Sequence, residues 1–224
     1  MVPRAVLFPR ATPHGFLPLA PEELEARFLA PARREGFFVE RRWAETHPEV
    51  QQPIPYVVVR RRGEAEPELL ALTRLPTQGE ARLHGRRSIG VGGHINPCDQ
   101  PAGPDGGDLF QRACVRELQE ELVLPDPLAT DRLRPLGLLK DDTTEVGAVH
   151  VGLVYEFDAA ELPLAIRETS AMTGGFEALS RLVEAARGEP DPFETWSSLL
   201  LRSGALAQKA PRPGARSAPT SLSR

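Results

Sequence analysis

Apolar residues occur along the chain in short runs whose spacing predicts strands and helices in turn. The strongest run, at residues 54–61, contains three consecutive valines and predicts a strand, and residues 68–75 predict a second one. The charged and glycine residues between them, at 62–64, indicate a hairpin turn. We therefore expect an antiparallel pair of strands in the first half of the chain.

The clearest helix is predicted after a loop rich in glycine and proline. Asp108 is a suitable N-cap and Pro125 marks a stop, so we expect this helix at residues 108–123. Shorter patterns predict helices at 21–29, 176–187 and 192–201, and strands at 36–39, 88–96, 133–139 and 146–157. This order of elements predicts an α/β fold in which a mixed sheet packs between helices.

The chain of 224 residues is long enough for one large domain. We expect that domain at residues 51–205, with an N-terminal extension at 1–50 packed on it. Residues 206–224 contain few apolar side chains, so we expect them to form a disordered tail.

Composition narrows the class of protein. The 27 basic and 31 acidic residues give a net charge of −4, which argues against a protein that binds nucleic acid polymers through a basic surface. Two cysteines cannot form a disulfide framework and are expected to be reduced thiols in a cytoplasmic protein. The apolar runs are too short for a membrane span.

Three glutamates of the predicted central helix, Glu117, Glu120 and Glu121, are spaced so that their carboxylates share one face. Most acidic stripes are solvated helix faces. Here, however, like charges at this spacing repel one another, and the stripe continues toward the helix start with Phe110 and Cys114. We therefore expect the stripe to face a cleft, where clustered carboxylates need a cation. A site made of oxygen ligands favours Mg²⁺ or Mn²⁺.

This segment resembles the Nudix (MutT-like) box, which reads glycine, five residues, glutamate, seven residues and then R-E-U-x-E-E-x-G-U, with U aliphatic. The matching residues are Gly93, Arg116, Glu117, Leu118, Glu120, Glu121 and Leu124. Two positions depart from the pattern, because Asp108 stands for the first glutamate and Val123 for the final glycine.

The spacing within the box also departs from the pattern. Arg116 follows Gly93 by 116 − 93 = 23 positions, nine more than the pattern has. We interpret residues 99–107 as a nine-residue loop inserted before the helix. The wider context at 88–96 and 145–152 resembles a bacterial branch known as predicted Nudix phosphoesterases.

The resemblance implies a Nudix-like α/β/α sandwich and hydrolysis of a diphosphate linkage in a nucleoside diphosphate derivative or a related small phosphoanhydride. It implies that Glu117, Glu120 and Glu121 hold Mg²⁺, with Mn²⁺ as an alternative, assisted by the carbonyl of Gly93. Catalysis would then depend on Glu120, Glu121 and Arg116, which orients the carboxylates. Nudix enzymes are often homodimers, although the sequence specifies no interface.

The family's general base often lies beyond the box, and Glu168 suits that role by its position, with Glu145 second. For both, the alternative is a solvated loop acid. Arg86 and Arg87 precede the glycine-rich run and are candidates for binding phosphate, or are ordinary surface arginines. His94 is a candidate for substrate binding, or a structural histidine held by hydrogen bonds.

Two rival functions stay open. A catalytically silent Nudix domain could sense a nucleotide ligand, although such a sensor has no need of the three glutamates. Cys98 follows the glycine run and is the one feature that resembles isopentenyl diphosphate isomerase, a Nudix-fold enzyme with a catalytic cysteine. The fuller cysteine motif of that enzyme is missing from this sequence.

Overall fold

The structure is a computed structural model that describes residues 1–75, 85–103, 107–160, 162–167 and 169–207. From residue 208 onward, the predicted tail lies outside the described residues. None of the helices in the described ranges has the length and apolar character needed to cross a membrane.

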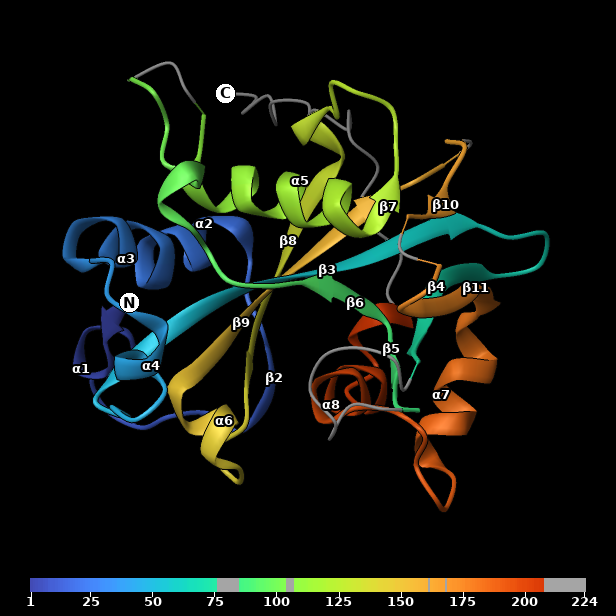
Figure 1. Cartoon of the computed structure of the whole chain (residues 1–224). Coiled ribbons are helices and arrows are strands. Elements are labelled where there is room, and N and C mark those ends of the chain that lie inside the picture. The colour runs from blue at the N-terminus through green and yellow to red at the C-terminus, as the bar shows by residue number, and fades with distance from the viewer. Residues whose placement is uncertain (76–84, 104–106, 161, 168, 208–224) are drawn as a thin grey trace, which may run out of the picture.

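The secondary structure contains short and long elements, which Figure 1 labels. The strands are β1 (Val2–Pro3), β2 (Gly15–Pro18), β3 (Val50–Arg62), β4 (Pro67–Arg74), β5 (Arg87–Ser88), β6 (Gly90–Gly92), β7 (Leu122–Val123), β8 (Leu133–Lys140), β9 (His150–Asp158), β10 (Ala165–Ile166) and β11 (Met172–Ala178). The helices are α1 (Arg4–Leu7), α2 (Pro21–Leu24), α3 (Ala30–Glu35), α4 (Arg41–Ala44), α5 (Leu109–Glu121), α6 (Glu145–Val149), α7 (Leu179–Arg187) and α8 (Thr195–Arg202). A π-helical turn, Glu25–Leu29, joins α2 to α3, and single 3₁₀ turns lie at Pro97–Asp99, Thr130–Arg132 and Ala205–Ala207.

The main sheet is mixed and has β3 at its centre. Its strand order is β11-β4-β3-β9-β8-β2, and β3 also pairs with β1 and β6. The β3–β9 pair is parallel, while β3–β4, β8–β9 and β2–β8 are antiparallel. The predicted hairpin is confirmed, since Arg62 pairs with Pro67 across the turn.

Alternate residues of β3 face two separate cores, as expected for a strand buried on both sides. Val57 and Val59 pack in the core that contains Phe110 of α5, whereas Tyr56 and Val58 pack with residues of α7 and α8. Figure 1 shows α5 on one face of the sheet and α7 with α8 on the other. The expected α/β/α sandwich with a mixed sheet is confirmed.

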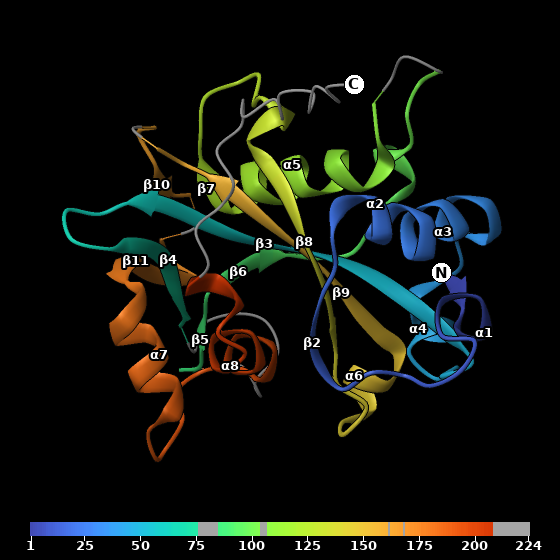
Figure 2. The same ribbon diagram turned by 180° about the vertical axis from the view of Figure 1, so that it is seen from behind.

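The first fifty residues contribute both strands and helices to this arrangement. β1 pairs with the start of β3, and β2 pairs with β8 at an edge of the main sheet. Helices α1 to α4 gather around the amino end of β3, which both views show (Figures 1 and 2). Phe28 and Leu24 are buried in the same core as α5, so this segment is tightly packed on the sheet.

Helix α5 begins where the sequence predicts. The carboxylate of Asp108 accepts hydrogen bonds from the backbone N–H groups of Phe110 and Gln111, which makes it the N-cap. The helix ends at Glu121, before the predicted residue 123, because Leu122 and Val123 pair with Ile166 and Ala165 as a short ladder.

One predicted strand is wrong, and two other predicted elements begin later than expected. Residues 36–39 form no strand in the structure and lie between α3 and α4 with Phe37, Phe38 and Val39 exposed. Residues 145–149 form helix α6, so the strand predicted from residue 146 begins at His150 instead. The helix predicted from residue 176 begins at Leu179, because the preceding residues form strand β11 against β4.

Candidate active site

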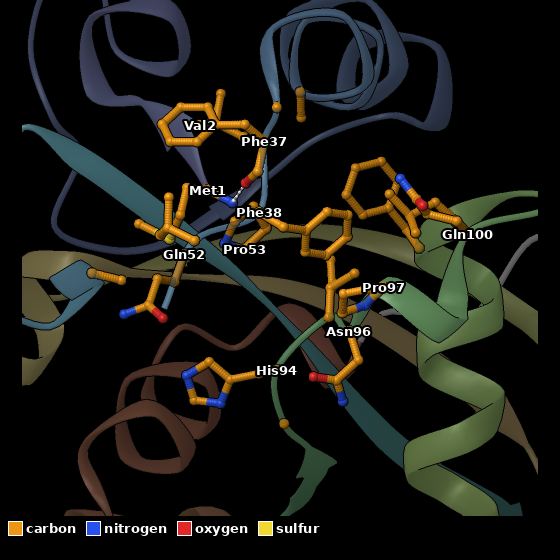
Figure 3. Close-up of a pocket in the computed structure, with 18 of the residues that line it drawn as sticks. Met1, Val2, Phe37, Phe38, Gln52, Pro53, His94, Asn96, Pro97 and Gln100 are labelled. Carbon is orange, nitrogen blue, oxygen red and sulfur yellow. Dashed lines mark hydrogen bonds between the residues drawn. The ribbon is translucent and has the colours of Figure 1, made fainter. Parts of the chain in front are cut away.

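Helix α5 lines a pocket of about 540 Å³ with the polar residues of the predicted box. The pocket lies between residues of the segment 1–53, the loop after β6 and helix α5. Its lining includes Gly93, His94, Arg116, Glu117 and Glu120. Figure 3 shows Phe37 and Phe38 on one side of the pocket, with His94, Asn96 and Pro97 on the other.

Arg116 connects the acidic residues of this site. Its Nη1 donates to Oε1 of Glu117 at 2.8 Å and to Oε1 of Glu120 at 3.0 Å. Its Nη2 donates to the backbone carbonyl of His94 at 2.8 Å, so the guanidinium also holds the loop after β6. One cation therefore bridges two box carboxylates and the loop that follows Gly93.

A further carboxylate, that of Asp99, lies against Arg116. The Asp99 side chain is 3% exposed and accepts hydrogen bonds from Arg116 Nε at 2.8 Å and Nη2 at 3.0 Å. Asp99 is six positions after Gly93 (99 − 93), which is the spacing of the first glutamate in the box pattern.

Asp108, which the sequence interpretation placed at that position, has a different partner. Its carboxylate caps α5 and pairs with Arg33 of α3. The assignment of Asp108 to the box glutamate is therefore wrong, and Asp99 takes that place. The extra nine residues run from 100 to 108 rather than from 99 to 107.

Gly93 is in close contact with the carboxylate of Glu117. A Cβ atom on Gly93 would lie 2.6 Å from both carboxylate oxygens of Glu117, closer than such atoms approach in proteins. Since only glycine leaves this space, the backbone of the loop and the glutamate of the helix meet directly. This contact explains why a glycine and a glutamate that are distant in sequence belong to one motif.

Burial changes the proton affinity of Glu117. Its side chain is 10% exposed, and loss of water around the carboxylate raises its pKa above the ordinary value of 4.5. Arg116 opposes this effect, while the nearby charges of Glu120 and Asp99 add to it. Burial thus favours the protonated form of Glu117 more than it does for a solvated glutamate.

The other two glutamates lie in different surroundings. The Glu120 side chain is 57% exposed and reaches the pocket beside Arg116. The Glu121 side chain is 16% exposed and lies 3.7 Å from the guanidinium of Arg74 on β4. The structure thus brings Glu117 and Glu120 together around Arg116 and places Glu121 toward the sheet.

His94 is held by a second histidine at the rim of the pocket. The Nε2 atoms of His94 and His150 are 3.2 Å apart, and Nδ1 of His150 lies 2.7 Å from the carbonyl oxygen of Val146. Because that carbonyl accepts, Nδ1 of His150 carries a proton, and burial lowers the pKa of the ring, which favours the neutral form. His94 therefore donates its Nε2 proton to His150.

The remaining candidates lie elsewhere or outside the described residues. Arg86 donates to the carbonyl of Asp191, and Arg87 pairs with Glu177 and packs its guanidinium 4.9 Å from the ring centre of Phe193. These contacts tie Arg86 to the segment before α8, and Arg87 to that segment and to β11. Glu168 lies outside the described residues.

Glu145, the second candidate for the general base, and the two cysteines lie within the described residues. Glu145 is exposed at the first residue of α6. Cys98 is exposed and lies outside the lining of the pocket, whereas Cys114 is buried on α5, where burial raises the pKa of its thiol. Cys114 is therefore a packing residue.

Comparison with known proteins agrees with the fold. No family model matches the chain. Tm1382, provisionally classed as a Nudix hydrolase, has 25% sequence identity and a TM-score of 0.69, with 92% of this chain and 97% of that chain covered. A NUDIX hydrolase from Alicyclobacillus acidocaldarius shares the fold, with a TM-score of 0.54 at 16% identity over 70% of this chain and 92% of that chain.

The chain belongs to the Nudix hydrolase family, whose members cleave pyrophosphate bonds in nucleotide derivatives. Among curated proteins, it is 32% identical over 159 residues to Protein YmaB of Bacillus subtilis (strain 168). The alignment covers 70% of this chain and 73% of that protein.

Proposed function

We propose that the protein is a divalent-metal-dependent hydrolase that cleaves the diphosphate linkage of a nucleoside diphosphate derivative or a related small phosphoanhydride. The observation that carries the proposal is the acidic cluster at the pocket. Arg116 is hydrogen-bonded to three carboxylates, those of Asp99, Glu117 and Glu120. The cluster thus keeps an excess of negative charge beside a cavity.

The donor set fits Mg²⁺ or Mn²⁺, because every side chain in question offers carboxylate oxygen. Among the described residues, no group of three or more acidic, histidine or cysteine side chains is gathered closely enough to form a metal site. The guanidinium of Arg116 instead occupies the position between Glu117 and Glu120. We propose that these two glutamates and Glu121 hold the ion, together with the carbonyl of Gly93.

The ion, when bound, would neutralise phosphate charge and lower the pKa of the attacking water. The side chains of the protein have separate tasks. Arg116 orients Glu117 and Glu120 through its hydrogen bonds and acts as a positioning residue. His94, whose ring is fixed by His150, contacts the substrate, and Glu168 is the proposed general base.

A small-molecule substrate suits the dimensions of the site. The pocket of about 540 Å³ lies in the range of roughly 300 to 1,000 Å³ that is usual for sites of drug-sized ligands. Arg86 donates to the carbonyl of Asp191 and Arg87 pairs with Glu177 of β11, so we do not assign phosphate binding to them. A cytoplasmic location and a homodimer stay predictions, and sedimentation analysis tests the second.

The test is a hydrolysis screen with Mg²⁺ or Mn²⁺ against nucleoside triphosphates, dinucleoside polyphosphates, NADH, ADP-ribose, nucleotide sugars and CoA. Wild type is compared with Glu117→Gln, Glu120→Gln, Glu121→Gln and Glu168→Gln. Glu184→Gln, on the exposed face of α7, is the matched control. We expect turnover on at least one substrate class, a loss in the box variants and no loss in the control.

Two results would overturn the proposal. Turnover that survives both EDTA and the box substitutions would remove the metal and its proposed ligands from the mechanism. Nucleotide binding without turnover on any substrate would instead identify the chain as a silent ligand sensor.

A further inference from the structure

Helix α5 ends without the glycine that the box pattern has, because Val123 stands in that place. The last helical residue is Glu121 and the C-cap is Leu122, so Val123 directly follows the cap. A glycine at this position commonly takes a left-handed conformation, in which the next N–H groups reach back to the last carbonyls of the helix. Valine is branched at Cβ and does not readily adopt that conformation. The helix therefore needs another source of donors.

The chain leaves α5 in an extended conformation instead. Leu122 has φ −122° and ψ 148°, and together with Val123 it forms β7, which pairs with Ile166 and Ala165 of β10. Figure 1 shows β7 and β10 beyond the end of α5. The N–H of Leu122 still donates to the carbonyl of Leu118. The carbonyls that follow Leu118 have no partner within an α-helix and depend on groups outside it.

A single arginine, Arg167, provides donors for three of these carbonyls. Its Nε donates to the carbonyl of Gln119 at 2.8 Å, and its Nη2 donates to that of Leu122 at 3.3 Å. Its backbone N–H donates to the carbonyl of Glu121 at 2.8 Å. The guanidinium also places a positive charge at the negative end of the helix dipole. Arg167, which follows β10, thus caps α5 from a distant part of the chain.

The bond to Gln119 replaces the one that a glycine cap would make. In a glycine-capped helix, the N–H two positions after the C-cap donates to the carbonyl of the third residue from the helix end. Those residues are Leu124 and Gln119 here, but the carbonyl of Gln119 accepts from Arg167. The apolar contact that accompanies such a cap is retained, since Leu124 packs against the core that contains Leu118. Arg167 therefore supplies the donor that the sequence of the box lacks.

The capped turn carries two of the proposed metal ligands. Glu120 and Glu121 are the last two residues of α5, whereas Glu117 lies one turn earlier. Hydrogen bonds from Arg116 hold the side chains of Glu117 and Glu120 but do not hold the backbone of the last turn. Fraying of an uncapped end would move Glu120 and Glu121 relative to Glu117. The geometry of the ligand set thus depends on the cap.

We infer that Arg167 is a positioning residue, which replaces the glycine cap of the box helix and so holds Glu120 and Glu121 in place to bind the metal ion. The inference rests on the proposed function for the role of the metal ion, whereas the cap is a property of the protein alone. A glycine at position 123 should therefore make the side chain of Arg167 dispensable.

The test compares wild type with Arg167→Ala, Val123→Gly and the double variant that combines them. Arg167→Ala removes the two side-chain hydrogen bonds and keeps the backbone bond to Glu121. Arg187→Ala is the matched control, because Arg187 is an exposed arginine at the end of α7, where Gly188 is the C-cap.

Two readouts avoid turnover, because the proposed base Glu168 directly follows Arg167 in the sequence. Hydrogen–deuterium exchange in EDTA measures how often the last turn of α5 opens, with the amides of β3 as an internal reference. Electron paramagnetic resonance then measures the binding of Mn²⁺ alone, without substrate.

We expect Arg167→Ala to speed amide exchange in the last turn of α5 about tenfold and to weaken Mn²⁺ binding about tenfold. The double variant should regain wild-type values of both within about twofold, and Val123→Gly or Arg187→Ala alone should change neither by more than that. Unchanged exchange in Arg167→Ala would overturn the cap. Faster exchange with unchanged Mn²⁺ binding, or a loss that Val123→Gly does not restore, would overturn the positioning role.

Failure of the proposed function gives a different pattern. Wild type that binds no Mn²⁺ and hydrolyses no substrate would sink the hydrolase proposal and the positioning role, while exchange would still decide whether Arg167 caps α5. Mn²⁺ binding that is lost in Glu120→Gln but retained in Arg167→Ala would leave the metal site standing and overturn the inference on Arg167.

Discussion

The carboxylate of Asp99 accepts two hydrogen bonds from the guanidinium of Arg116, which lies 17 residues later in the chain. Asp99 also accepts from the backbone N–H of Asn96, which fixes the 3₁₀ turn at Pro97–Asp99. The extra residues of this box therefore lie between Asp99 and the start of α5. The carboxylate–guanidinium contact is retained although the loop is longer.

Replacing Asp99 with alanine should destabilise the fold by about 3 kcal/mol, because Arg116 would lose a buried, charge-assisted partner. The measurement is urea-induced unfolding at neutral pH. Asp131→Ala, at an exposed aspartate, is the control and should change the free energy of unfolding by less than about 0.5 kcal/mol. Equal losses in the two variants would show that the Asp99–Arg116 pair contributes nothing specific.

A methyl group on Gly93 should affect turnover far more than stability. The new Cβ would overlap the Glu117 carboxylate, which is the free end of a side chain and can move aside. We expect turnover on the substrate found in the screen to fall on the order of 100-fold for a displacement of about 1 Å. Thermal denaturation should change little.

The control for Gly93→Ala is Gly175→Ala on β11. A Cβ atom at Gly175 would meet nothing within 4 Å, so this substitution adds a methyl group without a clash. Comparable activity in the two glycine variants would contradict the role of the Gly93–Glu117 contact.

The raised pKa of Glu117 predicts a pH-dependent difference between wild type and Glu117→Gln without metal. Burial favours the protonated carboxyl in the folded state, so ionisation destabilises the fold as pH rises above the ordinary value of 4.5. The free energy of unfolding of wild type should therefore fall relative to that of Glu117→Gln as pH rises above about 4.5. Arg116 reduces the effect, and Glu120 and Asp99 increase it.

Urea unfolding in EDTA across this range measures the difference, and Mg²⁺ should diminish it if the ion binds ionised Glu117. Glu120→Gln is the comparison, since the Glu120 side chain is largely exposed. A wild type that gains stability over Glu117→Gln as pH rises would have the opposite sign and would contradict the burial argument.

Cys98→Ala should leave hydrolysis within about twofold of wild type, because Cys98 is exposed and lies outside the pocket lining. The assay is the substrate screen, with Glu120→Gln as the variant expected to lose activity. A large loss in Cys98→Ala would revive the interpretation based on the isomerase.

The sequence predicted best those elements whose pattern is set locally. The valine-rich β3 and the Asp108-capped α5 carry strong patterns and lie within three or four residues of their predicted bounds. β11 was not expected because Gly174 and Gly175 have low strand propensity, and its partner β4 is distant in sequence. Helix α6 was not expected because Val146 and Val149 resemble the start of the following strand.

The sequence predicted the chemistry of the candidate site but did not identify all of its residues. Glu117, Glu120, Arg116 and Gly93 were recognisable from one motif, and the structure brings them to one pocket. Asp99 could have been found by counting six positions from Gly93. The helix-start pattern instead favoured Asp108, the N-cap of α5. The apolar pocket residues at 37–39 could not be found, because their apolar run is typical of a strand and their exposure depends on tertiary packing.

Strand β3 supplies Gln52 and Pro53 to the pocket and pairs with both β9 and β6. Gln52 pairs with His150, and Tyr56 pairs with Gly92, so hydrogen bonds of one sheet position both the buried Gln52 and the glycine loop after β6. The floor of the pocket is therefore preorganised, and ligand binding has little backbone freedom left to remove there. On ligand binding, the protein therefore loses conformational entropy mainly in exposed side chains such as Phe38 and Glu120. Affinity should then be most sensitive to substitutions of these side chains at the rim of the pocket.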